Sequence, residues 1–412
     1  MTVLTPSVIG TTALPPGTIP LLADKFAPHI ALILPLKSTL FASAAQAVQQ
    51  GFLMAASVQA RDFPVRIYNS SEEGKDAIAI YRQVIANGAV AVAGPLTRAD
   101  VTLLTAYPEI HVPTLVLNTT EQKAASSKLY FFSLNPEAEA RQVAQLAFAA
   151  KLHDATTISS GTALAKRLAA AFADEWKKLG GNINDEVVYK EGDNTNVLTN
   201  LPTAPWLVEP EPVTVTVVLP SGAIETVTPK RVGPPPAAPG NVVFLAAESK
   251  QARLIRPYLN PSLPIYASSQ LFNMESDTLT NYDLNDIRFV DMPWLLQPDH
   301  AAVMIYTRSE IPMDTDRDRL YAFGIDAYRL LNILLNNKLN KSLPLDGVTG
   351  RIRLSEFNVF QRDAQAAVFK YGHGLTPDGV TVMEAQRAAA KASANAAHKA
   401  LGAENAETKS AQ

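Results

Sequence analysis

The sequence predicts an α/β protein with two doubly wound lobes, each built around a parallel β-sheet. Short apolar runs alternate with amphipathic helical segments along most of the chain. The chain has 412 residues, a length that suits two domains better than one. The strand–helix units also outnumber the strands that one open sheet comfortably holds. Together these observations favour two lobes over one large sheet.

The first unit illustrates how a strand and a helix are recognised. Residues 29–36 form a nearly continuous apolar run around Pro35, which is typical of a parallel strand buried on both faces. Over 43–59, apolar residues recur every three or four positions, which predicts a helix with one buried face. By the same criteria, strands are predicted at 65–69, 90–93, 113–117 and 129–134, and helices at 75–87, 98–106 and 136–152.

The alternation continues through the second half of the chain. Strands are predicted at 156–159, 186–190, 242–245, 263–266 and 348–354, and helices at 162–179 and 318–336. Residues 369–371 are a short apolar run. Both ends depart from this pattern. Residues 1–27 are proline-rich and predict an extended leader. Residues 380–412 form an Ala-rich tail, in which a helix is predicted over 383–401.

A Pro-rich insertion at 206–239 interrupts the second predicted lobe. Within it, residues 213–219 and 223–228 alternate at period two around Pro220-Ser221-Gly222, which predicts a β-hairpin. One interpretation is a tolerated surface loop. The other is a hairpin that offers a strand edge to a partner protein.

The bulk composition excludes several classes of function. A formal net charge of −3 supplies no basic surface for a nucleic-acid backbone, so no nucleic-acid partner is expected. The absence of cysteine excludes disulfides and thiolate chemistry. No apolar run is long enough to span a membrane, and the first 24 residues lack the features of a signal peptide.

No catalytic motif is found in the chain. HExxH, GxSxG, the nucleotide phosphate loop and a GxGxxG after a strand are all missing, and the histidines are too far apart for ligand spacing. We therefore expect no metal, no cofactor and no enzymatic activity. His29 and His111 stand at strand starts and are interpreted as structural. Asp291 is the most suggestive single carboxylate, and we interpret it as a turn cap.

The acids Asp314, Asp316 and Asp318 match the first, third and fifth positions of a calcium-binding loop. Arg319 stands where that loop needs glycine, and Ile325 where it needs glutamate. The segment therefore predicts a charged turn that starts a helix.

Polar loops follow three of the predicted strands, where an open α/β sheet places its ligand crevice. Their hydroxyl, amide and backbone N–H groups could hold a small anion or a carboxylate. The alternative is that these residues only cap the helices that follow. The candidate ligand-binding residues are Leu96, Thr97, Arg98, Asn118, Thr119, Thr120, Ser268, Ser269 and Gln270, with Glu248 at the end of another strand.

Several segments carry a resemblance to a known family. The strand at 29–36 and the helix around 47–52 resemble the opening of type I periplasmic binding proteins. More specifically, the chain resembles the penicillin-binding protein activator (LppC/LpoA-like) lipoproteins from about residue 28 to 372. The segments that carry this likeness are 93–96, 287–295, 319–330 and 346–351.

The resemblance implies a bilobed fold whose chain crosses between lobes near 134, 268 and 353. The first lobe would then comprise 28–133 and 268–352, and the second 134–267 and 353–379. It also implies a periplasmic protein anchored to the outer membrane by a lipid on a cysteine, a residue that this sequence does not contain. The implied partner is a penicillin-binding protein that synthesises peptidoglycan.

The resemblance leaves a second function open, that of a solute-binding protein for an ABC transporter or sensor. Amino-acid-binding relatives pair a hydroxyl cluster with an acid that receives the ammonium group. Thr119, Thr120 and Thr97 could supply the hydroxyls, but 267–270 contains no carboxylate. Glu248 is a possible substitute. If regulation is the function, 206–239 and the region of Trp294 are candidate contact surfaces, although Trp294 could instead be a core residue.

Overall fold

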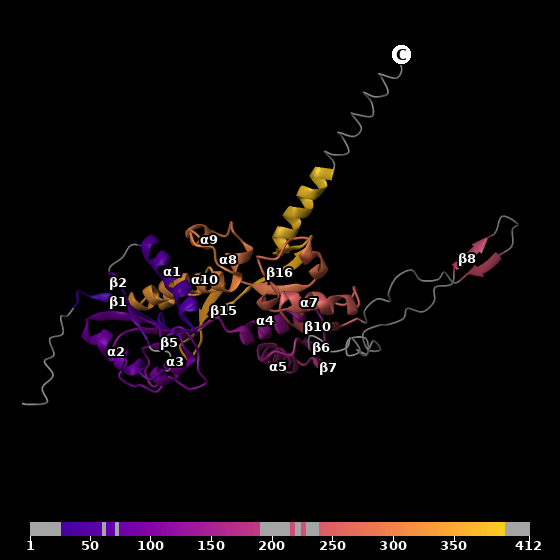
Figure 1. Cartoon of the computed structure of the whole chain (residues 1–412). Coiled ribbons are helices and arrows are strands. Elements are labelled where there is room, and N and C mark those ends of the chain that lie inside the picture. The colour runs from indigo at the N-terminus through magenta and orange to yellow at the C-terminus, as the bar shows by residue number, and fades with distance from the viewer. Residues whose placement is uncertain are drawn as a thin grey trace, which may run out of the picture.

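The computed structural model describes residues 26–59, 63–70, 74–189, 215–218, 224–227 and 239–391. Most of them form two lobes, each built on one β-sheet with helices on both faces (Figure 1). This arrangement confirms the predicted two-lobed α/β fold. Within the described residues, no helix combines the length and apolar character needed to cross a membrane.

The first lobe contains an eight-stranded sheet in the order β13-β14-β15-β5-β4-β3-β1-β2. Its strands are β1 (His29–Leu34), β2 (Val65–Asn69), β3 (Ala89–Ala93), β4 (Thr114–Val116), β5 (Leu129–Phe132), β13 (Leu345–Asp346), β14 (Arg351–Leu354) and β15 (Val359–Asp363). Strands β1 to β5 are parallel, as predicted, and so is β15, which was not predicted as a strand. The sheet is not parallel throughout, because β13 and β14 form an antiparallel edge.

Burial of strand β1 explains its continuous apolar sequence. Its alternate residues Ile30, Leu32 and Leu34 pack into the core that contains α1 (Ala42–Val58) and α10 (Thr315–Leu335). Ala31 and Ile33 point to the other face, into the core with α2 (Ala77–Ala86) and the end of α3 (Arg98–Thr105). The short helices α8 (Pro293–Leu296), α9 (Ala301–Met304) and α11 (Leu339–Ser342) complete this lobe.

The second lobe contains a seven-stranded sheet in the order β17-β16-β12-β11-β10-β6-β7. Its strands are β6 (Asp154–Ser159), β7 (Asn182–Val188), β10 (Asn241–Ala246), β11 (Ile265–Ala267), β12 (Arg288–Asp291), β16 (Gln365–Lys370) and β17 (His373–Leu375). Helices α4 (Pro136–Ala149) and α5 (Ala163–Lys178) cover one face, and α7 (Ser249–Ile255) covers the other. Strands β16 and β17 are antiparallel to their neighbours, so this sheet is mixed as well.

The chain crosses between the lobes three times, as the resemblance implies. The first crossing lies at 133–135, between β5 and α4, close to the expected residue 134. The second follows Asp291, because β12 pairs with β11 and β16 in the second sheet. The third lies at Ala364, because β15 still pairs with β5 in the first sheet.

The strand pairings therefore show that the predicted positions of the second and third crossings, near 268 and 353, are wrong. Strand β12, which follows residue 268, belongs to the second sheet, and β14 and β15 belong to the first. Hydrophobic periodicity identifies a strand but not the sheet that it joins, because both sheets bury apolar strands in the same way.

The predicted hairpin in the insertion is confirmed: β8 (Val215–Val218) and β9 (Ile224–Val227) pair antiparallel. Most other residues of 206–239 lie outside the described residues, as does the predicted leader up to residue 25. In the tail, residues 377–391 are helical, so this helix begins before the predicted residue 383. Its predicted continuation to 401 lies outside the described part of the chain.

Candidate functional site

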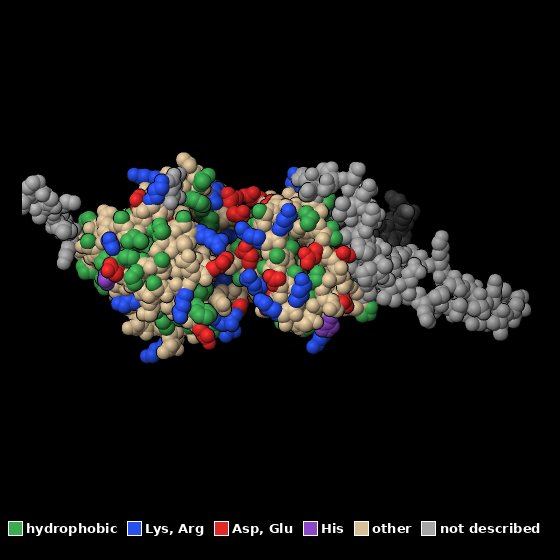
Figure 2. All heavy atoms as spheres, turned by 90° about the horizontal axis from the view of Figure 1, so that it is seen from below, with side chains coloured by type: hydrophobic (Ala, Val, Ile, Leu, Met, Phe, Trp, Pro, Cys, Tyr) green, Lys and Arg blue, Asp and Glu red, His purple; other side chains and the backbone are tan. Residues whose placement is uncertain are grey.

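A groove of about 700 Å³ runs between the lobes on the side of helices α4 and α5. Basic and acidic side chains gather along this seam between the lobes (Figure 2). The structure brings four predicted site residues together here, all from the first lobe. They are Arg98, Asn118, Thr119 and Thr120. The second lobe supplies Glu137, Arg141, Arg167 and Asp174, none of which was predicted.

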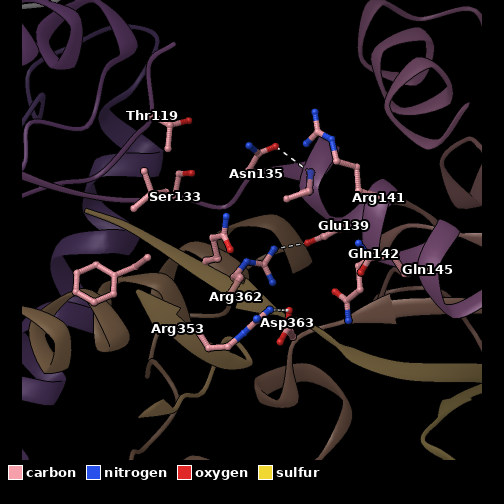
Figure 3. A pocket seen from close by; sticks show the side chains of 14 residues that line it. Thr119, Ser133, Asn135, Glu139, Arg141, Gln142, Gln145, Arg353, Arg362 and Asp363 are labelled. Carbon is pink, nitrogen blue, oxygen red and sulfur yellow. Dashed lines mark hydrogen bonds and ion pairs between the residues drawn. The ribbon is translucent and has the colours of Figure 1, made fainter. Parts of the chain in front are cut away.

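An inner pocket of about 270 Å³ adjoins this groove at the first and third crossings (Figure 3). Asn135 begins helix α4 there, because its side-chain oxygen accepts a hydrogen bond from the Ala138 N–H at 3.1 Å. Gln142 binds the backbone of Ala364 through both its amide atoms, at 2.8 and 2.9 Å. These bonds hold this part of the pocket wall in place.

Arg141 lines both the groove and the inner pocket. Among the described residues, its guanidinium has no hydrogen bond or ion pair, whereas Arg98 is paired with Glu121 and Arg167 with Glu137. An unpaired guanidinium is a natural anchor for a carboxylate or phosphate. Sequence reasoning missed Arg141 because only the fold brings α4 against the loops of the first lobe.

Thr97 does not face the groove but begins helix α3. Its hydroxyl oxygen accepts a hydrogen bond from the Asp100 N–H at 3.3 Å and donates to the Asp100 carboxylate at 2.8 Å. Burial raises the pKa of Asp100, and the Thr97 bond opposes that shift. Leu96 supplies a backbone oxygen to the Asn118 amide at 3.0 Å. For Thr97 the capping interpretation is therefore confirmed.

The predicted residues of the second lobe lie apart from the hydroxyl groups of the groove. Ser268 and Ser269 are buried, and Ser269 donates a hydrogen bond to Glu139 at 2.5 Å. Gln270 and Glu248 line a different pocket of about 360 Å³, between α7 and the start of α10. The ten predicted residues therefore do not assemble into one cleft.

The pocket between α7 and the start of α10 carries side chains of both charges. Glu248 and Glu275 supply carboxylates, and Arg253 supplies a guanidinium whose buried Nη1 atom has no hydrogen-bond partner. An acid and an unsatisfied guanidinium in one pocket could hold the two ends of a zwitterion. The sequence predicted Glu248 and Gln270 for this purpose but gave no reason to select Arg253.

Four other sequence interpretations can be compared with the structure. Asp291 accepts a bond from the Met292 N–H at 2.8 Å and also forms a buried ion pair with Arg319. Asp314 caps α10 by accepting from the Arg317 N–H at 2.8 Å, which confirms the predicted helix start. Trp294 is fully buried, so it is a core residue. His29 is buried and bonded to Tyr68, as expected for a structural histidine.

Known relatives resemble the chain in sequence. Penicillin-binding protein activator LpoA from Photobacterium profundum is 28% identical over 365 residues, which cover 86% of this chain and 56% of that protein. The corresponding protein of Yersinia pseudotuberculosis is 27% identical and is covered over 49% of its length. The chain thus spans about half the length of the curated relatives that it matches.

Solved structures resemble the chain in fold. A putative branched-chain amino acid ABC transporter from Chromobacterium violaceum is 32% identical, with a TM-score of 0.65, and the match covers 83% of this chain and 100% of that one. The C-domain of LpoA from Haemophilus influenzae, described as a regulator of PBP1A, is 21% identical, with a TM-score of 0.64 over 85% of this chain and 99% of that one. Both support the type I periplasmic-binding-protein fold.

A family model described as LppC putative lipoprotein matches residues 18–373. That match spans both lobes and all three crossings, so it covers the whole fold rather than one shared motif. The chain belongs to the LppC family of putative lipoproteins.

Proposed function

We propose that the protein regulates peptidoglycan synthesis by contacting a penicillin-binding protein, without catalysing a reaction itself. The observation that carries this proposal is the family match over both lobes, together with curated relatives named penicillin-binding protein activators. As part of this proposal, the protein acts in the periplasm, and its precursor is anchored to the outer membrane by a lipid.

The geometry of the groove supports regulation over amino-acid transport. Amino-acid-binding relatives hold the ligand carboxylate with hydroxyl groups and the ammonium group with an acid across the same cleft. Here Thr119 and Thr120 line the groove, whereas Glu248 lines the separate pocket beside α7. Of the acids that do line the groove, Glu121 and Glu137 are already paired with Arg98 and Arg167, and Asp174 is exposed. A ligand ammonium group there would find no buried, unpaired carboxylate, and a buried ammonium group without a partner is costly.

A binding and activity experiment tests the regulatory function. The purified chain is added to an immobilised bifunctional penicillin-binding protein from the same organism, and glycan polymerisation and peptide crosslinking are measured with and without it. We expect retention on the synthase and a faster rate of one of the two reactions. Absence of both retention and stimulation would remove the proposal.

A variant with residues 206–239 replaced by a short Gly-Ser linker tests the hairpin as the contact surface. If β8 and β9 form the contact, this variant keeps its thermal stability and loses retention. Arg82→Gln, a change in the exposed Arg82–Glu109 pair of the first lobe, serves as the control, with its Tm measured alongside.

The second candidate function is solute binding, and the pocket beside α7 is the observation that favours it. Glu248 and Arg253 could bind the ammonium and carboxylate groups of a free amino acid or a short peptide. A thermal-shift screen with amino acids and dipeptides tests this function, since a ligand that binds only the folded state raises Tm. An upward shift that is lost in both Glu248→Gln and Arg253→Gln would support it.

A further inference from the structure

Two buried ion pairs join the lobes at the points where the chain crosses between them. One connects Arg319 of α10, in the first lobe, to Asp291 at the end of β12, in the second. The other connects Arg362 of β15, in the first lobe, to Glu139 of α4, in the second. All four side chains are at least nine-tenths buried. Neither pair was predicted from the sequence, because the two partners of each pair lie in different lobes.

Arg319 is held by acceptors from three directions. Its Nε and Nη2 atoms donate to the two carboxylate oxygens of Asp291, at 3.2 and 2.7 Å. Nη2 also donates to the backbone oxygens of Ser269 and Phe272, at 2.9 and 2.8 Å. Nη1 donates to Asp316 on its own helix at 2.7 Å. This fork geometry is specific in direction, so α10 cannot rotate against β12 without losing several bonds.

Ser269 connects the two ion pairs. Its backbone oxygen accepts from Arg319, while its N–H and hydroxyl donate to Glu139 at 3.3 and 2.5 Å. Glu139 in turn accepts from Arg362 (Figure 3). The Nη1 atom of Arg362 continues the chain to the backbone oxygen of Thr349 at 3.2 Å. A continuous series of polar contacts therefore passes from β12 through α10 and α4 to β15.

The third crossing is fixed by a further contact. Gln142, one turn along α4 from Glu139, exchanges two hydrogen bonds with the backbone of Ala364. The crossing segment between β15 and β16 is thus attached to the second lobe at the place where a hinge would have to bend. The Asp291–Arg319 pair thus holds the second crossing, and the Arg362–Glu139 pair and the Gln142 bonds hold the third.

We propose that this network, which we call the interlobe clamp (Glu139, Ser269, Asp291, Arg319 and Arg362), holds the two lobes in one fixed orientation. The protein then does not open and close around a ligand as a transport protein does. Separating a buried ion pair leaves each charge without its partner in a site from which water is excluded. The free-energy cost of those unpaired charges opposes any rotation of the lobes that breaks the pairs. The clamp follows from the geometry alone and does not depend on the regulatory function.

A distance measurement between the lobes tests the clamp. The chain has no cysteine, so two introduced cysteines are the only labelling sites. Spin labels at the exposed positions Gln46→Cys on α1 and Lys166→Cys on α5 report the distance between the lobes by pulsed electron paramagnetic resonance. We expect one narrow distance distribution for the full chain, unchanged by a mixture of amino acids or by muropeptides.

Clamp variants carry the same two labels. We expect Glu139→Gln, which removes the charge that faces Arg362, to widen the distribution at least twofold, and Ser269→Ala to widen it less. Arg353→Gln is the control, because it breaks the exposed Arg353–Asp363 pair within the first lobe and leaves the width unchanged.

Two results would overturn the clamp. One is a bimodal distribution, or a shift larger than its width on ligand addition, in the unsubstituted protein. The other is an unchanged width in folded Glu139→Gln and Ser269→Ala. If both variants fail to fold, the labelled parent protein still decides the matter through its own distribution. Failure to bind a penicillin-binding protein would leave these distances unaffected, so the two proposals are tested separately.

Discussion

Gly51 of helix α1 lies directly against the backbone carbonyl of Tyr321 in helix α10. A Cβ atom at residue 51 would be 1.8 Å from the Tyr321 oxygen. Gly324 makes the reciprocal approach, since a Cβ atom there would be 2.1 Å from the Val48 oxygen. The two helices therefore meet backbone to backbone over the core of the first lobe.

This contact predicts that Gly51→Ala destabilises the first lobe strongly. The added methyl group meets backbone atoms of a packed helix, which cannot move aside as a flexible side chain can, so we expect a loss of about 3 kcal/mol or more. Gln46→Ala, on the exposed side of the same helix, is the control and should change stability by less than about 0.5 kcal/mol. Urea unfolding measures both, and equal midpoints for the two variants would disprove the close approach.

Thr97 provides a test of capping against ligand binding. Thr97→Ala removes the acceptor for the Asp100 N–H at the start of α3, so we expect a loss of about 1 kcal/mol in the free energy of unfolding. Thr97→Ser keeps the oxygen and should retain most of the stability. Because the Thr97 side chain is buried, no partner protein can touch it, and neither change should alter retention on a penicillin-binding protein. A selective loss of retention in Thr97→Ala would return this residue to the functional site.

The fold could be predicted from the sequence because buried parallel strands and one-sided helices leave clear patterns. Strand β2 matches its predicted bounds, and α1 differs from them by one residue at each end. The local role of Thr97 could also be anticipated, since capping depends on residues three positions apart. These features are set by neighbours in the sequence.

The clamp and the lobe boundaries could not be predicted in the same way. Arg362 and Glu139 are 223 positions apart, and nothing local to either residue indicates its partner. The short strands β12 and β15 gave weak patterns, and their sheet membership depends on pairing with β11 and β5. The groove residue Arg141 was missed for the same reason. A contact between two segments that are distant in the sequence can be identified only when the fold is known.

Asp100 predicts a pH dependence of stability. Burial raises its pKa above the ordinary value of 3.8, with the Thr97 bond opposing and Asp76 adding to the shift. The folded state therefore binds the proton more tightly than the unfolded state, so this group's contribution to stability is present at low pH. That contribution is lost as the pH rises from about the ordinary value through the raised one.

Comparison with Asp100→Asn isolates this contribution. The asparagine amide stays neutral at every pH, whereas Asp100 must ionise in a buried site as the pH rises. The free energy of unfolding of the variant should therefore increase relative to that of the parent protein between pH 4 and pH 7. Chemical denaturation at closely spaced pH values measures the difference. A difference that is constant with pH, or that changes in the opposite direction, would show that Asp100 is not shifted upward.

Substitutions of Trp294 test whether this residue belongs to the core or to an interface with a partner protein. Its side chain is fully buried, its indole N–H donates to Asp318 at 2.8 Å, and the Arg308 guanidinium lies 4.6 Å from the ring centroid. Trp294→Ala should therefore cost about 3 to 5 kcal/mol, through the cavity it leaves. Trp294→Phe keeps most of the volume but removes one of the two donors to the Asp318 carboxylate, with Arg308 remaining as the other, so we expect a loss of about 1 to 3 kcal/mol.

The affinity of Trp294→Phe for a penicillin-binding protein distinguishes the two roles. A side chain that no partner can touch should leave the dissociation constant unchanged as long as the variant is folded. Affinity is measured well below the Tm of the variant, with Arg353→Gln as a control of surface charge in the same lobe. A tenfold weaker affinity with an unchanged circular dichroism spectrum would mean that the segment from Pro293 to Leu296 rearranges on binding and presents the indole to the partner.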